Sequence, residues 1–342
     1  LLKYWEDDSQ LRDILITGGD ALMSSDNSLK QILNEVLEMA IRKKEANKKR
    51  KEGEKFAEMV KIRIGTRLPV YLPQRITPEL TSILRNFKEK ASKVGFKQFV
   101  IQTHFESAME ITPEVREAMQ RILSAGWVVF NQLVFTAAAS RRGHTAKLRQ
   151  SLNAIGVLPY YTFSVKGFLE NSHNFATNAR AVQEAVEEKV LGNVPDESLE
   201  KLKDLPLDAE NIVSKIKEIK SDLNIPFLAT DRNVLNLPGV GKSLTYRAIG
   251  ITRYGKRILE FDYDRTRGHS PIIEKMGKIH IIESKPILEY LEQLEEMGEN
   301  IREYERIYGY SIGETEERPS LFEYPEYDYH ITDEVTNFRL SK

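Results

Sequence analysis

Two short motifs contain the residues whose types and spacing could do chemistry, and the first is Gly18-Gly19-Asp20, after a short apolar segment. Two adjacent glycines let a ligand approach backbone N–H and C=O groups, and a carboxylate beside them can bind an ammonium group. A tight turn capped by Asp20 explains the same pattern without a ligand. The motif alone leaves both interpretations open.

The second motif is a glycine-containing loop that ends in Lys242. Residues 239–243 read Gly-Val-Gly-Lys-Ser, like the end of a phosphate-binding loop. The Walker pattern needs a glycine five positions before the Gly-Lys pair, where this chain has Asn236, and a helix must follow, whereas a strand-like segment follows here. We therefore reject a nucleoside triphosphatase. A lysine in such a loop is instead suited to forming a Schiff base with an aldehyde cofactor.

Polar residues also follow the other predicted strands. Arginines at strand ends hold carboxylates or phosphates, but they also form structural ion pairs. A single histidine is more often structural than functional, and a buried amide pair needs hydrogen-bond partners. The residues concerned are Arg63, Arg67, Arg75, His104, Glu106, Glu110, Asn131 and Gln132.

Short β-branched segments that alternate with helical patterns position these residues. We predict strands at residues 13–17, 60–65, 99–103, 127–135 and 158–165, and helices at residues 28–44, 78–93, 113–125 and 145–155. Five β-α repeats in order predict an α/β fold, a partial (β/α)6 barrel. In such a barrel the residues that follow the strands face the ligand.

The pattern changes after Val165, and we predict three regions. Residues 1–170 form the partial barrel with five of six repeats, residues 171–285 an appended C-terminal α+β unit with the lysine loop, and residues 286–342 an acidic helix and an aromatic tail. Within them we expect helices at 176–190, 208–223 and 287–307, a short apolar segment at 225–230, and strands at 244–251 and 257–263 joined by a Tyr254-Gly255 turn.

Composition limits the possible functions. The 342 residues include 50 basic and 51 acidic side chains, for a net charge of −1, and 41% are hydrophobic. This balance predicts a globular protein with a sizeable core and no overall attraction to nucleic acid or membranes. The sequence contains no run of eighteen apolar residues, so no transmembrane span is predicted. The absence of cysteine excludes disulfides, thiolate zinc sites and iron–sulfur ligands within this segment.

Two charged segments have alternative explanations. The basic run Arg42 to Lys55 fits a solvated extension of a helix, but a basic stripe can also bind nucleic acid or an acidic lipid surface. The acidic, aromatic tail Leu321 to His330 fits packing on its own domain or a neighbouring subunit, and binding of a separate partner is the alternative.

Taken together, seven blocks resemble the lysine 2,3-aminomutase family, radical S-adenosylmethionine enzymes that also use pyridoxal phosphate. The blocks occur in family order between Asp13 and Lys242. The resemblance implies a barrel of radical S-adenosylmethionine type whose first strand and cluster loop lie upstream of Leu1. The blocks are Ile14–Leu22, Arg63–Arg67, Pro73–Leu80, Thr103–Phe105, Asn131-Gln132, Pro159–Tyr161 and Pro238–Lys242.

The resemblance also implies roles for individual residues. Lys242 is expected to bind pyridoxal phosphate as a Schiff base, and the other residues are expected to contact S-adenosylmethionine. The cysteines that hold the family's [4Fe–4S] cluster are expected upstream, so we expect this segment alone to be inactive. The residues expected to contact S-adenosylmethionine are Gly18, Gly19, Asp20, His104 and Gln132.

Two departures from the family pattern suggest the substrate. Lysine-specific members place two aspartates around the substrate's ε-ammonium group, whereas the matching residues here are Lys166 and Asn236. A positive pocket favours an anionic side chain, as in glutamate 2,3-aminomutase. Lys166 could instead extend from the rim into solvent, and Asp231 could occupy the second position in place of Asn236.

The resemblance therefore implies an isomerase that moves the α-amino group of L-glutamate to C3 by a 5′-deoxyadenosyl radical and pyridoxal-phosphate mechanism. A mutase for lysine or another amino acid and a non-catalytic barrel scaffold remain the alternatives. By family analogy we expect a cytoplasmic homo-oligomer with a small-molecule substrate and no nucleic-acid or membrane partner.

Overall fold

The computed structural model describes residues 2–164, 172–177, 179–180, 246–261, 279–304 and 307, with residues 218 and 221–222. Most of the predicted helices at 176–190 and 208–223, the segment at 225–230 and the tail at 321–330 lie outside these residues. The predicted site residues Lys166, Asn236 and Lys242 lie outside them too. None of the described helices is long and apolar enough to cross a membrane.

The chain divides into two compact units. Unit 1 consists of Leu1–Leu133, Lys147–Tyr160 and Tyr329–Lys342, and unit 2 consists of Val134–Ala146 and Tyr161–Asp328.

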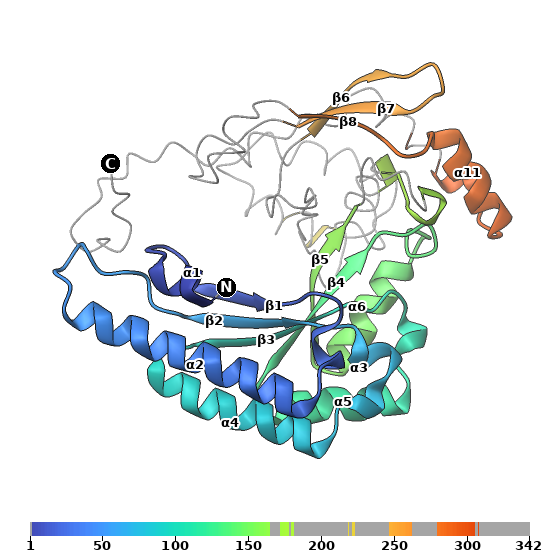
Figure 1. Cartoon of the computed structure of the whole chain (residues 1–342). Coiled ribbons are helices and arrows are strands. Elements are labelled where there is room, and N and C mark those ends of the chain that lie inside the picture. The colour runs from blue at the N-terminus through green and yellow to red at the C-terminus, as the bar shows by residue number, and fades with distance from the viewer. Residues whose placement is uncertain are drawn as a thin grey trace. The chain divides into compact units, whose positions relative to one another are not determined.

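A five-stranded sheet confirms the predicted α/β class (Figure 1). The strand order is β1-β2-β3-β4-β5, and β1 to β4 pair in parallel. Each strand lies within two residues of its predicted bounds, because alternating β-branched and polar residues mark the strands clearly. The strands are β1 (Asp13–Ile16), β2 (Lys61–Gly65), β3 (Gln98–Thr103), β4 (Val128–Val134) and β5 (Val157–Phe163).

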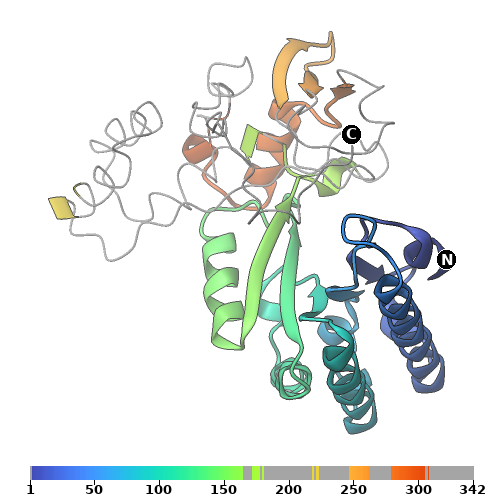
Figure 2. The same cartoon turned by 90° about the vertical axis from the view of Figure 1, so that its left-hand side faces the viewer.

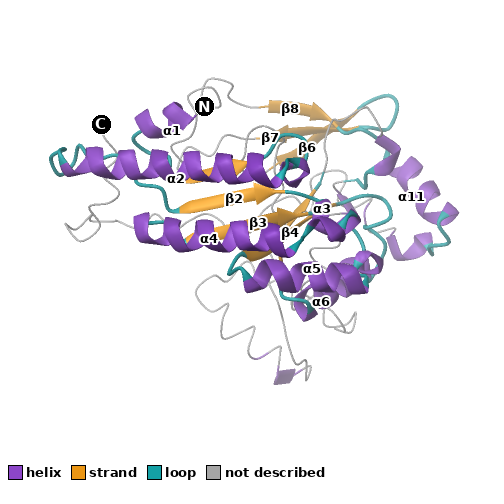
Figure 3. Cartoon of the chain, turned by 60° about the horizontal axis from the view of Figure 1, so that its bottom comes forward, coloured by secondary structure: helices purple, strands orange, loops and turns teal. Residues whose placement is uncertain are grey.

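Helices cover one face of this sheet. In Figure 3, α2 (Asp26–Lys48) and α4 (Pro78–Val94) cross in front of the strands, and Figure 2 shows the same two helices, in blue and teal, running side by side. The helices α5 (Pro113–Ser124) and α6 (His144–Ala154) continue the series. The Thr77 and Thr112 hydroxyls cap α4 and α5, and each of these helices begins with proline.

The first part of the basic run forms the C-terminal end of α2. This helix ends at Lys48, four residues beyond its predicted end at residue 44. The buried Lys43 ammonium donates hydrogen bonds to the carbonyls of Trp5 and Asp8 at 2.6 and 2.7 Å, which ties the short helix α1 (Leu2–Asp7) to α2. Lys44 donates to the Val94 carbonyl at the end of α4. The predicted extension of the helix is therefore confirmed, but Lys43 is buried between helices rather than solvated.

Short elements that the sequence did not predict occupy the loops after β1, β2 and β3. These loops contain the one-turn helices η1 (Ala21–Met23), η2 (Pro73–Arg75) and η3 (Ala108–Glu110), and the helix α3 (Leu68–Tyr71). All four are shorter than the windows in which helical periodicity can be recognised.

Unit 2 contains an antiparallel sheet of β6 (Tyr246–Ile251), β7 (Arg257–Phe261) and β8 (Ile279–Ile282). The predicted hairpin at Tyr254-Gly255 is confirmed, whereas β8 was not predicted. The predicted helix 287–307 is wrong beyond Glu296, because α11 (Ile287–Glu296) ends before Gly298, which has a φ of +84°. Residues 301–304 form a separate tight helical turn.

Candidate functional site

The site lies on unit 1, in the loops that follow β1, β2 and β3 at the carboxyl edge of the sheet. Gly18 and Gly19 adopt φ values of +109° and +58°, so the predicted tight turn is confirmed. A Cβ atom at either glycine would meet nothing within 4 Å. Their backbone groups are therefore open to a ligand, and a side chain at either position would be strained.

Asp20 joins the loops after β1 and β2. One carboxylate oxygen accepts hydrogen bonds from Leu22 N at 3.0 Å and Thr66 Oγ1 at 2.5 Å. The other oxygen accepts from Arg67 N at 2.6 Å and Leu68 N at 3.1 Å. Four donors fill the acceptor positions of a carboxylate, so its direct effect is to fix the shape of the glycine turn.

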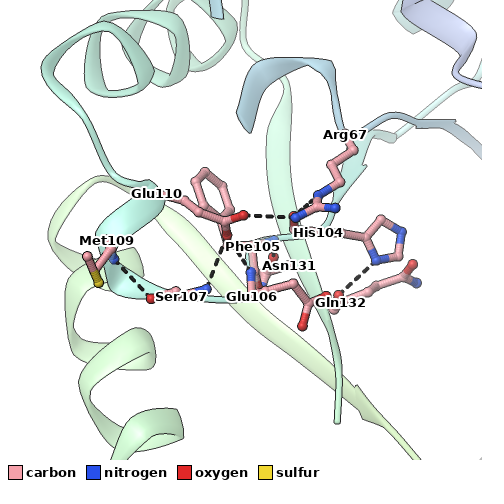
Figure 4. Close-up of polar contacts among 9 residues, drawn as sticks. All are labelled: Arg67, His104, Phe105, Glu106, Ser107, Met109, Glu110, Asn131 and Gln132. Carbon is pink, nitrogen blue, oxygen red and sulfur yellow. Dashed lines mark hydrogen bonds and ion pairs between the residues drawn. The ribbon is translucent and has the colours of Figure 1, made fainter. Parts of the chain in front are cut away.

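A second set of contacts joins the loops after β2 and β3. Arg67 donates to the His104 carbonyl at 3.2 Å and pairs with Glu110 at 2.8 Å (Figure 4). The other Glu110 oxygen accepts the backbone N–H groups of Glu106 and Ser107. These contacts hold the loop that contains His104 in a single position relative to the loop after β2.

His104 is held as a neutral acceptor. Its Nδ1 atom lies 2.9 Å from the Gln132 carbonyl, which can only accept, so Nδ1 bears the hydrogen. Burial lowers the pKa of His104 below its ordinary value of 6.5, and the Arg67 cation adds to this effect, while the Gln132 carbonyl opposes it. The neutral ring therefore presents Nε2 as a hydrogen-bond acceptor.

The neighbouring amides Asn131 and Gln132 have different roles. The buried Asn131 side chain accepts from Phe105 N at 2.6 Å and donates to Phe105 O at 3.1 Å, so both its oxygen and its nitrogen have a partner. Figure 4 shows the Gln132 side chain next to the His104 ring and away from Glu110. The structure thus brings His104 and Gln132 together, and their contact with a common ligand stays a prediction.

The predicted strand-end arginines all have internal partners. Arg63 contacts the two oxygens of Asp13 at 2.9 Å each, and Arg75 donates to the carbonyls of Leu22 and Ser24. Together with the Arg67–Glu110 pair, these contacts confirm the structural ion-pair interpretation for this edge of the sheet. Within the described ranges, no group of three or more His, Cys, Asp or Glu side chains could hold a metal ion.

Two polar residues at this edge were missed by the sequence analysis. The hydroxyl of Thr66 supplies one of the four donors to Asp20, and no sequence signal separates it from an ordinary strand-end threonine. Gln102 is 4% exposed and interrupts an otherwise apolar strand. A polar residue within a mostly apolar strand was a usable signal.

Similarity to known proteins indicates the class of protein to which this parallel α/β fold belongs. No protein-family model matches the chain. The chain is 32% identical, over 90% of its length, to the uncharacterized KamA family protein MJ0634 of Methanocaldococcus jannaschii, and the match covers 40% of that protein.

Two functionally named relatives match about half of the chain. The L-lysine 2,3-aminomutase of Acetoanaerobium sticklandii is 33% identical over 47% of this chain and 33% of its own length. The glutamate 2,3-aminomutase of Clostridioides difficile is 31% identical over 50% of this chain and 35% of its own length. The chain belongs to the KamA family, and the resemblance seen in the sequence is confirmed. It spans between a third and two fifths of the length of these relatives.

Proposed function

We propose that this chain forms part of an amino-acid 2,3-aminomutase that acts on L-glutamate. The observation that carries the proposal is its similarity to proteins named as lysine and glutamate 2,3-aminomutases, at 33% and 31% identity. The fold of unit 1 is compatible with the interpretation as a partial (β/α)6 barrel of radical S-adenosylmethionine type, because parallel strands carry helices on one face and candidate residues at their carboxyl ends.

The described residues fit S-adenosylmethionine as a ligand. Gly18 and Gly19 leave backbone groups open, with room for a ligand where side chains would otherwise stand. The neutral His104 ring can accept a hydrogen bond from a ribose hydroxyl through Nε2, and Gln132 lies beside it. Asp20 supports this arrangement indirectly, by holding the glycine turn against the loop after β2.

The cofactors would carry the bond chemistry. When bound, S-adenosylmethionine and a reduced [4Fe–4S] cluster supply the radical that activates the substrate, and pyridoxal phosphate on Lys242 carries the migrating amino group. The residues of this chain orient the ligands and exclude water. His104 contributes a neutral acceptor at a fixed position because both Arg67 and the Gln132 carbonyl hold its loop and ring.

Glutamate is proposed on charge. Lys166 and Asn236 replace the two aspartates of lysine-specific members, so a lysine ammonium group would meet a like charge, whereas the γ-carboxylate of glutamate would meet an opposite one. The similar identities to the lysine and glutamate enzymes do not separate the two substrates. The charge reversal therefore carries this part of the proposal.

A substrate-switch experiment tests the proposal. The purified protein, supplied with both cofactors and a reductant, is assayed by NMR for the 2,3-amino shift on L-glutamate and on L-lysine. We expect a preference for glutamate that Lys166→Asp reduces by about tenfold or more, while Lys147→Asp, at an exposed position of α6, leaves it unchanged. A preference for lysine, or a glutamate preference that survives Lys166→Asp, contradicts the substrate assignment.

The role of Lys242 has a separate spectroscopic test. Wild-type protein mixed with pyridoxal phosphate should show the absorbance band of a protein-bound Schiff base, and Lys242→Ala should lack it. Lys147→Ala serves as the matched control. Retention of the band in Lys242→Ala assigns the Schiff base to another lysine.

A further inference from the structure

One amide in unit 1, that of Gln102, makes no hydrogen bond to the residues that the structure describes. Gln102 lies on β3, where Phe99 contacts Phe87 of α4 with ring centroids 6.2 Å apart. Side chains alternate along a strand, so residues 99 and 101 face the helices and Gln102 faces the opposite side of the sheet. In the parallel register it pairs with Gly65 of β2 and Phe130 of β4.

The Gln102 side chain is enclosed but unsatisfied. It is 4% exposed, and within the described part of the chain its amide makes no hydrogen bond. The neighbouring Asn131 amide, equally buried, has both of its groups paired with Phe105. The polar atoms of Gln102 are not among the fully buried side-chain atoms that lack a partner, so a ligand can reach this amide. An accessible amide on an otherwise enclosed side chain is suited to bind a ligand group.

An aromatic stack lies beside Gln102. The ring of Phe130, its partner in the register, stacks on Tyr160 of β5 with centroids 4.6 Å apart and planes 18° from parallel. Tyr160 is 37% exposed. On the other side of Gln102, Gly65 has no side chain to fill the layer. A Cβ atom at Gly65 would lie 3.4 Å from the Thr17 hydroxyl oxygen, so this side of the layer is bordered by Thr17. The layer thus combines an amide with an aromatic surface.

This layer continues the candidate site inward. His104 and Gln132 each lie two residues beyond Gln102 and Phe130, and strand alternation therefore places them on the same side, one step nearer the carboxyl edge. A ligand that contacts His104 and Gln132 at the edge has Gln102 and the stacked rings directly below it.

We propose that Gln102 and the Phe130–Tyr160 stack hold the planar heteroaromatic ring of a bound cofactor. The inference rests on the proposed function and deepens it. A glutamine amide donates and accepts in one plane, which matches the edge of a ring with nitrogen or oxygen substituents, and an aromatic surface binds the face of such a ring. The pyridine ring of pyridoxal phosphate and the adenine ring of S-adenosylmethionine share this chemistry.

Binding titrations test the proposal without turnover. The purified wild-type protein and Gln102→Leu are titrated with pyridoxal phosphate, followed by absorbance, and with S-adenosylhomocysteine, followed by calorimetry. We expect Gln102→Leu to weaken binding of one of the two by about tenfold. Weaker pyridoxal-phosphate binding identifies the pyridine ring as the occupant, and weaker S-adenosylhomocysteine binding identifies the adenine ring.

Gln98→Leu is the matched control. Gln98 is exposed, lies on the same strand and face at the opposite end, and should leave both affinities unchanged. A structural role for Gln102 would make Gln102→Leu less stable, whereas removal of an unsatisfied amide should leave the melting temperature equal or higher. Tyr160→Leu should weaken the same ligand, and Tyr160→Phe, which keeps the stack, should not.

Some outcomes overturn the inference. If folded Gln102→Leu and Tyr160→Leu both bind the two ligands as wild type does, the layer holds no cofactor ring. Wild-type protein that binds neither ligand overturns both this inference and the proposed function. Wild-type protein that binds both ligands but moves no amino group contradicts the proposed function alone, and the titrations still decide the role of Gln102.

Discussion

Unit 1 and unit 2 both bury polar side chains, but they treat them differently. In unit 2, Arg257 and Glu283 are 1% and 2% exposed and form a two-point ion pair at 2.7 and 3.1 Å. Lys285, whose pKa burial lowers to about 8, donates to Gln293 and to the His173 carbonyl. On unit 1, His104 keeps an acceptor available and Gln102 has no partner within the described residues.

Paired buried groups stabilise the fold, whereas polar groups with unused hydrogen-bonding capacity can bind a ligand. Buried polar groups are normally paired, because an unpaired one forfeits its hydrogen bonds to water. Two hydroxyls among the described residues of unit 2 follow this rule, since Tyr290 bonds Ser140 at 2.6 Å and Tyr304 bonds Glu299 at 2.7 Å. Unused hydrogen-bonding capacity on one face of a parallel sheet, at its carboxyl edge, therefore indicates where a ligand can bind.

The largest effect is expected from breaking the buried ion pair of unit 2. Arg257→Met leaves the Glu283 carboxylate buried without its partner and should lower the free energy of unfolding by about 3 to 5 kcal/mol in urea titrations. The double variant Arg257→Met/Glu283→Met should recover most of this loss. A loss in Arg257→Met below about 1 kcal/mol would show that the pair is solvated and would weaken the contrast between the units.

The next largest effect is expected at Asp20. Asp20→Ala leaves the donors of Leu22, Thr66, Arg67 and Leu68 without an acceptor, and should cost about 2 kcal/mol of unfolding free energy. It should also weaken S-adenosylhomocysteine binding, because the glycine turn loses its support. Asp7→Ala, outside this network, is the control. Unchanged stability would mean that backbone and solvent replace the carboxylate.

A smaller effect is expected at Lys43. Lys43→Met removes the ammonium group that bonds Trp5 and Asp8, and should cost about 1 to 2 kcal/mol, concentrated in α1. Hydrogen exchange should show α1 opening first, while the amides of α4 keep their protection. Lys51→Met, at an exposed position of the same run, should have no effect. Equal protection of α1 in both variants would contradict the anchoring role.

The smallest effect is expected from titration of His104. Because burial lowers its pKa in the folded protein, the unfolded chain takes up a proton near pH 6.5 before the folded protein does. His104 therefore makes stability fall as the pH drops below 6.5 and through its lower folded pKa. Replacing it with Gln should flatten this part of the melting-temperature profile. An identical profile in the variant would show that His104 titrates normally.

Periodic segments were predictable from the sequence, and isolated contacts were not. The bounds of β3 and α4 agree with their predictions to one residue, because alternation and the Thr77-Pro78 cap are local signals. The prediction missed the end of α11 because apolar residues recur with helical spacing on both sides of Gly298. That pattern predicted a longer helix despite the glycine. The partners of Lys43 lie 38 and 35 residues away, so no local pattern could reveal them.

The candidate site shows the same division. The glycine turn and the closeness of His104 to Gln132 follow from the positions of these residues after parallel strands. The saturation of Asp20 by donors from another loop does not, because it depends on the backbone path after β2. The positive pocket expected from Lys166 and Asn236 stays a prediction, since both lie outside the described ranges.

We propose that the carboxyl edge of the sheet in unit 1 binds S-adenosylmethionine. The most direct test is the dissociation constant of S-adenosylhomocysteine for wild-type protein, His104→Ala and the control His144→Ala. We expect His104→Ala to bind about tenfold or more weakly while it stays folded, and His144→Ala to bind like wild type. Equal affinity in all three proteins would contradict the claim.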